Sequence, residues 1–355
     1  MNSLKHYLII GQGLAGTLLS FELLEKGHKV TIIASKEIPS SSKVAAGLFN
    51  PVVFKRLVPS WRAHEFIPFL KKRYSHLEML LQRKFLYSVP LSKLIETQSE
   101  LELWLKKKGN EELKMFVKDE IEKIHISGIE QELQMGEIEE SGYVHIKSFL
   151  EGAFLYFQDN TTLLQEDFDF SQLSLTLEKP QYKGIFYDAL IFCEGYHVHQ
   201  NPYFTFLPFK PVNGDVLTLK IPSYQYSKCF NKNFFLLPLH DGNYRLGATY
   251  NWSNLVFETN ENAKNELLAR VQGYIKGEIT VVQHEAGVRP SSNDRRPILG
   301  AHPQHKNLYI FNGLGAKGVM LAPYFAEQLV AHITLGEAIE KEVSIERYYR
   351  LQQGL

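Results

Sequence analysis

Three glycines near the start of the chain have the spacing that lets a backbone turn bind a phosphate. Gly11, Gly13 and Gly16 directly follow an apolar run that ends at Ile10. In a strand–turn–helix unit, the first glycine permits a tight turn and the second lets backbone N–H groups approach a pyrophosphate. The third lets helix and strand pack closely, and the positive end of the helix faces the anion. The sequence therefore predicts a dinucleotide site at Gly11, Gly13, Leu14, Ala15 and Gly16.

The residues that follow supply the elements that this turn needs. A helical run covers residues 17–26, Gly27 is placed to end it, and a second apolar strand covers residues 29–33. Further along, we expect buried strands over residues 187–192 and 308–311. Helices are expected over residues 61–83, 149–157 and 318–335. Strand-rich segments fall between these elements, which indicates one domain interrupted twice by another.

The predicted fold class is α/β. It combines a Rossmann-type nucleotide-binding domain on a parallel sheet with an interleaved α+β substrate domain on a mainly antiparallel sheet. We expect the nucleotide-binding domain to be discontinuous, with residues 1–84, 146–207 and 286–355. The substrate domain is then formed by residues 85–145 and 208–285.

Composition narrows the class of protein. The 355 residues include 39 Lys and Arg and 39 Asp and Glu, so no global field favours nucleic acid or anionic membrane. The two cysteines, Cys193 and Cys229, form neither a disulfide framework nor zinc-type spacing, so we expect no metal site and a reducing, cytoplasmic location. Glycines interrupt the first apolar run and Glu22 follows it, which argues against a secretion signal. No apolar run is long enough to span a membrane.

Three further blocks follow the glycine turn in order. They are SKVAAGLFNP at residues 42–51, HEAGVRP at residues 284–290 with Asp294 and PILG behind it, and GLGAKGVMLAP at residues 313–323. Together the four blocks resemble the FAD-dependent D-amino-acid oxidase and glycine oxidase family over nearly the whole chain. The resemblance implies oxidation of a carbon–nitrogen bond in an amino acid or secondary amine, by hydride transfer to flavin N5. It also implies non-covalent FAD, because neither cysteine stands where related enzymes attach the flavin.

The resemblance assigns cofactor contacts to these blocks. Small side chains at residues 45–47 let backbone lie against the flat isoalloxazine, and Ser42 can donate to pyrophosphate or ribityl oxygens. The turn at residues 313–318 opens a helix whose positive end faces the flavin and stabilises its reduced, negative form. Beyond the first turn, the expected cofactor-binding residues are Ser35, Lys36, Ser42, Lys43, Ala45, Ala46, Gly47, Phe168, Cys193, Glu194, Gly195, Arg289, Gly313, Leu314, Gly315, Ala316, Lys317, Gly318 and Val319.

Three basic residues are the catalytic candidates. In amino-acid-oxidising relatives, the arginine that corresponds to Arg289 pairs with the substrate carboxylate. A bidentate pair of this kind fixes orientation and contributes about 1.5–3 kcal/mol; the alternative is a structural arginine that bridges the domains. Lys317 adds charge beside the flavin or is a solvated loop lysine. Arg245 falls where sarcosine-oxidase-like members carry a lysine over the flavin that assists oxygen, which leaves the electron acceptor open.

The chain also departs from the family at two other positions. Relatives end the second strand with an acid that binds the adenosine ribose, whereas this chain has Ala34, and Glu37 comes too late. Glycine-oxidase-like members place a substrate-contacting tyrosine where this chain has Phe235. One hydrogen bond to the substrate carboxylate is therefore expected to be missing.

Other functions remain open at this point. Lys55, Arg56, Trp61 and Arg62 could frame an acidic substrate, bind RNA as in a bifunctional tRNA-uridine-modifying enzyme, or form a solvated helix entrance. The balanced charge favours a small-molecule amine substrate and no nucleic acid. Lys36 would suit a 2′-phosphate in an NAD(P)-dependent dehydrogenase, against which residues 46–47 and 313–318 argue. A non-catalytic flavin-binding protein is the last alternative, and the oligomeric state is open.

Overall fold

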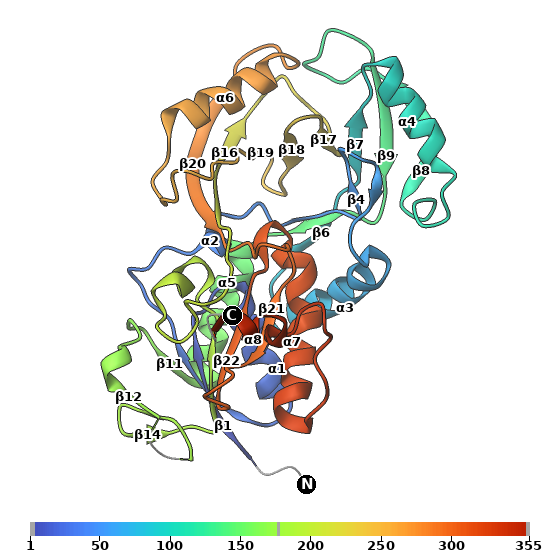
Figure 1. Ribbon diagram of the computed structural model, residues 1–355. Helices are drawn as coiled ribbons and strands as arrows, with labels where there is room; N and C mark the ends of the chain where they lie inside the picture. Colours follow the sequence, from blue (N-terminus) through green and yellow to red (C-terminus); the bar gives the residue numbers. More distant parts are fainter. Residues whose placement is uncertain (1–3, 176–177, 353–355) are drawn as a thin grey trace.

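A mainly parallel sheet of six strands organises one lobe of the protein, the lower lobe in Figure 1. The computed structural model describes residues 4–175 and 178–352. Within the sheet, neighbouring strands pair in parallel except for the last, which is antiparallel to its neighbour. The strands in spatial order are β11 (Thr162–Leu164), β2 (Lys29–Ile33), β1 (His6–Ile10), β15 (Ala189–Phe192), β22 (Leu308–Asn312) and β21 (Ile298–Ala301). The predicted Rossmann-type parallel sheet is confirmed.

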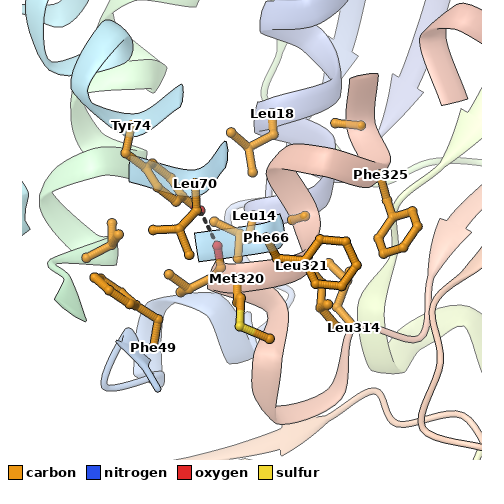
Figure 2. Close-up of a cluster of buried hydrophobic side chains, with 14 of the residues drawn as sticks. Leu14, Leu18, Phe49, Phe66, Leu70, Tyr74, Leu314, Met320, Leu321 and Phe325 are labelled. Carbon is orange, nitrogen blue, oxygen red and sulfur yellow. Dashed lines mark hydrogen bonds between the residues drawn. The ribbon is translucent and has the colours of Figure 1, made fainter. Parts of the chain in front are cut away.

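Four helices pack together beside this sheet. They are α1 (Leu14–Glu25), α3 (Ala63–Leu81), α5 (Ile146–Asn160) and α7 (Gly318–Leu335). The first ten residues of α1 are all buried, as expected for a helix that is apolar around its whole circumference. Figure 2 shows its Leu14 and Leu18 meeting Phe66 of α3 and Met320 and Phe325 of α7. The helix that begins at the glycine turn of residues 11–16 is therefore fixed by a large apolar core.

A second sheet of eight strands forms the upper lobe in Figure 1. Its pairings are antiparallel apart from β17 with β7, which are parallel and join an early segment of the chain to a late one. The strands in spatial order are β20 (Thr280–Arg289), β16 (Val212–Lys220), β19 (Tyr244–Gly247), β18 (Phe235–Pro238), β17 (Cys229–Asn231), β7 (Leu91–Leu94), β9 (Leu133–Ile138) and β8 (Val117–Ile124). The lobe also carries α4 (Gln98–Lys108) and α6 (Glu261–Gln272). The predicted antiparallel second sheet is confirmed.

Smaller elements complete the chain. Two three-stranded sheets and one two-stranded sheet consist of β3 (Leu48–Phe49), β10 (Gly142–Val144) and β6 (Leu86–Ser88); β12 (Leu173–Ser174), β13 (Gln181–Tyr182) and β14 (Ile185–Phe186); and β4 (Val52–Val53) with β5 (Val58–Pro59). Short helices are α2 (Ser41–Val44), α8 (Tyr349–Gln352) and the 3₁₀ turns η1 (Phe170–Gln172), η2 (Gly195–Gln200), η3 (Gly315–Lys317) and η4 (Ile345–Tyr348).

The strands follow the expected division of the chain. All six strands of the parallel sheet fall within residues 1–84, 146–207 and 286–355, and β20 of the other sheet crosses the expected boundary to end at Arg289. The exact domain boundaries therefore remain a prediction. Across residues 4–175 and 178–352, no helix is both long and apolar enough to cross a membrane.

Candidate FAD and substrate site

The glycine turn after β1 brings the start of α1 against the end of β15. A Cβ on Gly11 would lie 2.5 Å from the carbonyl oxygen of Cys193, and one on Gly16 would lie 1.9 Å from the carbonyl oxygen of Gly11. Neither position can carry a side chain without moving backbone. The Leu14 N–H, one of the donors that a helix leaves free at its start, points to Ser42 Oγ at 3.1 Å. The turn therefore presents backbone donors and a hydroxyl at one place.

A cavity of about 470 Å³ extends from this turn to the second sheet. It brings together most of the expected site residues, from segments far apart in the chain. Those lining it are Gly11, Gly13, Leu14, Ala15, Ser35, Ser42, Lys43, Ala45, Ala46, Gly47, Phe168, Cys193, Glu194, Gly195, Arg289, Leu314, Gly315, Ala316, Gly318 and Val319. Among the expected residues, Gly16, Lys36, Arg245, Gly313 and Lys317 do not line it.

Arg289 lies at the second-sheet end of this cavity, at the last position of β20. Its Nη1 reaches the carbonyl oxygens of Asn213 and Thr249 at 3.3 and 3.4 Å. Its guanidinium carbon lies 4.7 Å from the centre of the Tyr250 ring. Burial lowers the pKa of Arg289, while Tyr250 and Asp215 act in the opposite direction.

The charge of Arg289 has no carboxylate partner among the ion pairs of the described residues. Space for its guanidinium depends on Gly214 of the neighbouring strand. A Cβ on Gly214 would lie 2.3 Å from Arg289 Nη1 and 2.4 Å from the carbonyl oxygen of Thr249. Gly214 and Gly287 face each other across β16 and β20, and both line the cavity. The sheet thus places the guanidinium of Arg289, which has no carboxylate partner in the described structure, in the cavity wall.

The other two catalytic candidates are engaged beside the cavity. Arg245 donates to the Val44 carbonyl oxygen at 2.7 Å and to Thr218, and it forms an ion pair with Glu285 at 2.6 Å. It therefore ties α2 to the second sheet. Lys317 Nζ donates to Ser60 Oγ at 2.8 Å, and burial together with the charge of Arg296 lowers its pKa to about 8.

The Cys193 thiol and the Glu194 carboxyl, which follow β15, are both shielded from water. Burial raises the pKa of Glu194 to about 8, and its Oε2 accepts a hydrogen bond from Asn201 at 2.7 Å, which acts in the opposite direction. Burial also raises the pKa of Cys193, so its thiol is held protonated. These groups therefore add little negative charge to the part of the cavity beside the start of α1.

The polar residues of the cavity wall that sequence reasoning missed include Gln12, Glu166 and Tyr250. Within the described residues, Gln12 Nε2 and Glu166 Oε1 are buried without a hydrogen-bond partner. Gln12 lies inside the glycine turn and could have been predicted from the sequence. Glu166 and Tyr250 follow strands whose pairing cannot be read from a local sequence pattern. Buried polar atoms of this kind are rare unless a ligand or water meets them. Together with the start of α1, they fit a long, polar dinucleotide such as FAD.

The departures from the family pattern are visible in the structure. Ala34 uses its N–H to bond the Leu164 carbonyl oxygen at 2.9 Å and offers no side-chain acceptor. Phe235 lines the cavity and offers no hydroxyl there. Arg62 is fully engaged with Glu65, Glu340 and Tyr324, so its charge is not free for a ligand.

The comparisons with known proteins identify the family. A family model described as FAD dependent oxidoreductase matches residues 6–332, so the chain belongs to this family, and FAD is its cofactor. The NAD(P)-dependent alternative is thereby set aside. The structure is similar to iminodiacetate oxidase from Chelativorans sp. BNC1, with a TM-score of 0.78 and 21% identity over 96% of this chain and 98% of that one. Glycine oxidase from Geobacillus kaustophilus gives a TM-score of 0.74 and 18% identity over 94% and 96%.

One curated relative carries a name that refers to tRNA modification. The tRNA 5-methylaminomethyl-2-thiouridine biosynthesis bifunctional protein MnmC of Acinetobacter baylyi is 23% identical over 94% of this chain and 53% of its own length. The chain thus spans about half the length of this relative. A match to the glycine oxidase of Bacillus licheniformis is shorter and covers 38% of this chain and 37% of that protein.

Proposed function

We propose that this oxidoreductase oxidises the carbon–nitrogen bond of a small amine that carries a carboxylate, either an amino acid or a secondary amino acid. The observation that carries the proposal is Arg289, a partly buried guanidinium that lines the FAD cavity without a carboxylate partner in the described structure. An unpaired buried cation is costly, and a substrate carboxylate would satisfy it. The similar folds of an iminodiacetate oxidase and a glycine oxidase support the same class of substrate.

The residues around Arg289 suit this task. Gly214 leaves the space that the guanidinium occupies, and the Asn213 and Thr249 carbonyl oxygens hold one side of it. Tyr250 packs against the guanidinium face, so the N–H donors on the edge away from the Asn213 and Thr249 carbonyl oxygens are left for a carboxylate. Tyr250 also brings a phenol to this part of the cavity wall, where Phe235 supplies none.

FAD, when bound, would supply the two-electron acceptor: the substrate carbon gives up a hydride, the amine releases a proton to solvent, and water hydrolyses the resulting carbon–nitrogen double bond. The protein orients the amine, because the reacting carbon must be held at short range. We assign Arg245 a positioning role, since it holds the Val44 carbonyl at the end of α2, next to residues 45–47. Lys317, one residue before α7, is assigned an electrostatic role behind the cavity wall.

Matched pairs of amines test the proposal. Anaerobic reduction of the flavin is measured with proline against pyrrolidine, and with N-methylglycine against dimethylamine. We expect reduction by the carboxylate-bearing member of at least one pair, and little by its partner. Bleaching by neither member of any pair, in an extended panel, would favour the non-catalytic flavin-binding alternative.

Arg289→Ala is the decisive variant for that assay. It should lower kcat/KM by about 10–100-fold, through KM and kcat together, because binding and orientation share the contact. Arg289→Lys keeps the charge without the fork and should recover activity partly. The FAD spectrum should survive both changes, and the exposed Arg350→Ala serves as the control. Unchanged reduction kinetics in Arg289→Ala would make this arginine structural.

A flavin-dependent tRNA-uridine side-chain oxidoreductase is the second candidate. It is favoured by the relative MnmC, which matches along 94% of this chain. The exposed pair Lys55 and Arg56 would then be the first phosphate contacts to examine. The balanced charge of the chain supports the amine proposal over this one.

A further inference from the structure

We propose that Glu166 binds the adenosine ribose of FAD, in place of the acid that the end of β2 lacks. The end of β2 offers little for a ribose. Ala34 has no acceptor side chain, and the Ser35 Oγ already accepts N–H groups from Glu37 and Ile38 at 3.1 and 2.9 Å. Glu37 is exposed and does not line the cavity. A ribose diol at this edge therefore needs a partner from another strand.

Strand β11 supplies that partner through its register. It is the parallel neighbour of β2, and Leu164 stands opposite Ile33 at the carboxyl end of both strands. The Ala34 N–H extends the pairing by bonding the Leu164 carbonyl oxygen at 2.9 Å. Glu166 follows two residues after Leu164, beyond the end of β11, just as Ser35 follows two residues after Ile33, and both line the cavity. Neighbouring strands lie about 4.8 Å apart, a step that a glutamate side chain can span.

One carboxylate oxygen of Glu166 accepts a hydrogen bond, and the other accepts none from the described residues. Its Oε2 accepts from Lys183 Nζ at 2.7 Å, whereas its Oε1 is buried and has no hydrogen-bond partner among the described residues. Glu166 and Ser35 both line the cavity. A buried carboxylate oxygen without a donor requires one, and a ribose hydroxyl is a donor of the right kind.

A hairpin fixes Glu166 in this position. Lys183 and Gly184 form the two-residue connection between β13 and β14, with φ of 48° and 79°, the conformation that tight hairpin turns require. The hydrogen bond to Glu166 raises the pKa of Lys183, so the ammonium stays charged. Phe168, two residues beyond Glu166, lines the same cavity and stacks on Tyr182 of β13 with ring centres 4.5 Å apart. The small sheet thus builds an adenosine site around one carboxylate.

The test compares cofactors that do and do not carry the adenosine. Apoprotein prepared by removing the flavin is titrated with FAD and with FMN, and binding is followed by quenching of flavin fluorescence. Glu166→Gln keeps the size of the side chain and removes its charge. It should weaken FAD binding about tenfold, as for loss of a hydrogen bond to a charged group, and leave the Kd for FMN unchanged. Glu37→Gln, the matched control two residues beyond Ser35, should change neither.

An FAD analogue lacking the 2′-hydroxyl of its adenosine ribose closes a thermodynamic cycle. The wild-type protein should prefer FAD over the analogue, and Glu166→Gln should lose most of that preference. An unchanged Kd for FAD in Glu166→Gln overturns the proposal. Equal weakening of FAD and FMN would assign Glu166 a structural role instead and would overturn it as well. Because no amine is involved, these outcomes are independent of the proposed substrate.

Discussion

The two ends of the cavity are built by different means. The dinucleotide end consists of glycines, backbone N–H groups and one hydroxyl, at the start of a helix whose first ten residues are buried. At the Arg289 end, a charged side chain sits at the last position of a strand, between carbonyl oxygens and an exposed aromatic ring. The first end is determined by short-range chain geometry, and the second by which strands of the large sheet meet. We therefore expect substitutions at the dinucleotide end to abolish FAD binding. Substitutions at the Arg289 end should lower the rate of amine oxidation and leave FAD binding intact.

The largest expected effect comes from filling the dinucleotide end. A Cβ on Gly13 already lies 3.2 Å from Ser42 Oγ, and the branches of a valine would extend into the space in front of α1. Gly13→Val should therefore abolish FAD binding, so that the purified protein is colourless. The measurement is the visible spectrum together with the nucleotide released by acid, which for the wild-type protein should be intact FAD. Gly109→Val, at a helix end with no atom near its Cβ, is the control.

A smaller but more selective effect should follow at the Arg289 end. A Cβ on Gly214 would lie within 2.5 Å of both terminal nitrogens of Arg289, so Gly214→Ala must displace the guanidinium. A displacement of about 1 Å at such a contact can cost up to about 100-fold in rate. We expect kcat/KM for the best amine to fall by about 10–100-fold while FAD binding stays intact. If FAD binding and turnover fall together, the two ends are not separable in the way proposed.

The third prediction concerns the pH dependence of stability at Glu194, which follows β15 beside the glycine turn. Burial raises its pKa from 4.5 to about 8, so between these values the folded protein keeps a proton that the unfolded chain has lost. Stability from this group is thus fully present below pH 4.5 and is lost as pH rises towards 8. Glu194→Gln should remove this slope and raise the free energy of unfolding above pH 8 by up to roughly 5 kcal/mol.

Denaturant unfolding of the FAD-free protein at a series of pH values measures that slope. The exposed Glu130→Gln provides the control, since an exposed carboxyl should contribute no such slope. Parallel pH curves for wild type and Glu194→Gln would show that Glu194 ionises freely in the folded state.

The smallest effect is expected outside both ends. Lys55 and Arg56 are exposed and do not line the cavity, and Arg62 is already paired with Glu65 and Glu340. The double variant Lys55→Ala/Arg56→Ala should leave flavin reduction unchanged, and wild-type protein should show no tight tRNA binding. Submicromolar, salt-sensitive tRNA binding that the double variant loses would promote the tRNA-modifying alternative.

The same contrast explains what sequence reasoning could reach. The expected helix over residues 318–335 coincides with α7, because its apolar period and the closing Gly336 are local signals. The glycine turn was equally open to prediction. Tyr250 and Glu166 were missed, because their places depend on strands that meet across long stretches of chain, as when β11 adds to the edge of β2. The roles of Arg245 and Lys317 remain predictions, since both side chains are engaged beside the cavity.

The order of strands in the parallel sheet has a consequence for synthesis on the ribosome. The chain makes β1 and β2 first, yet the free edge of β15 is covered only by β22, which ends at Asn312. Until then β15, an interior strand of the complete sheet, has one unpaired edge. Unpaired strand edges pair readily with strands of other chains. The antiparallel sheet can close earlier, since its last strand ends at Arg289. A chain stopped at residue 290 should therefore contain all strands of the eight-stranded sheet and still aggregate through the unpaired edge of β15.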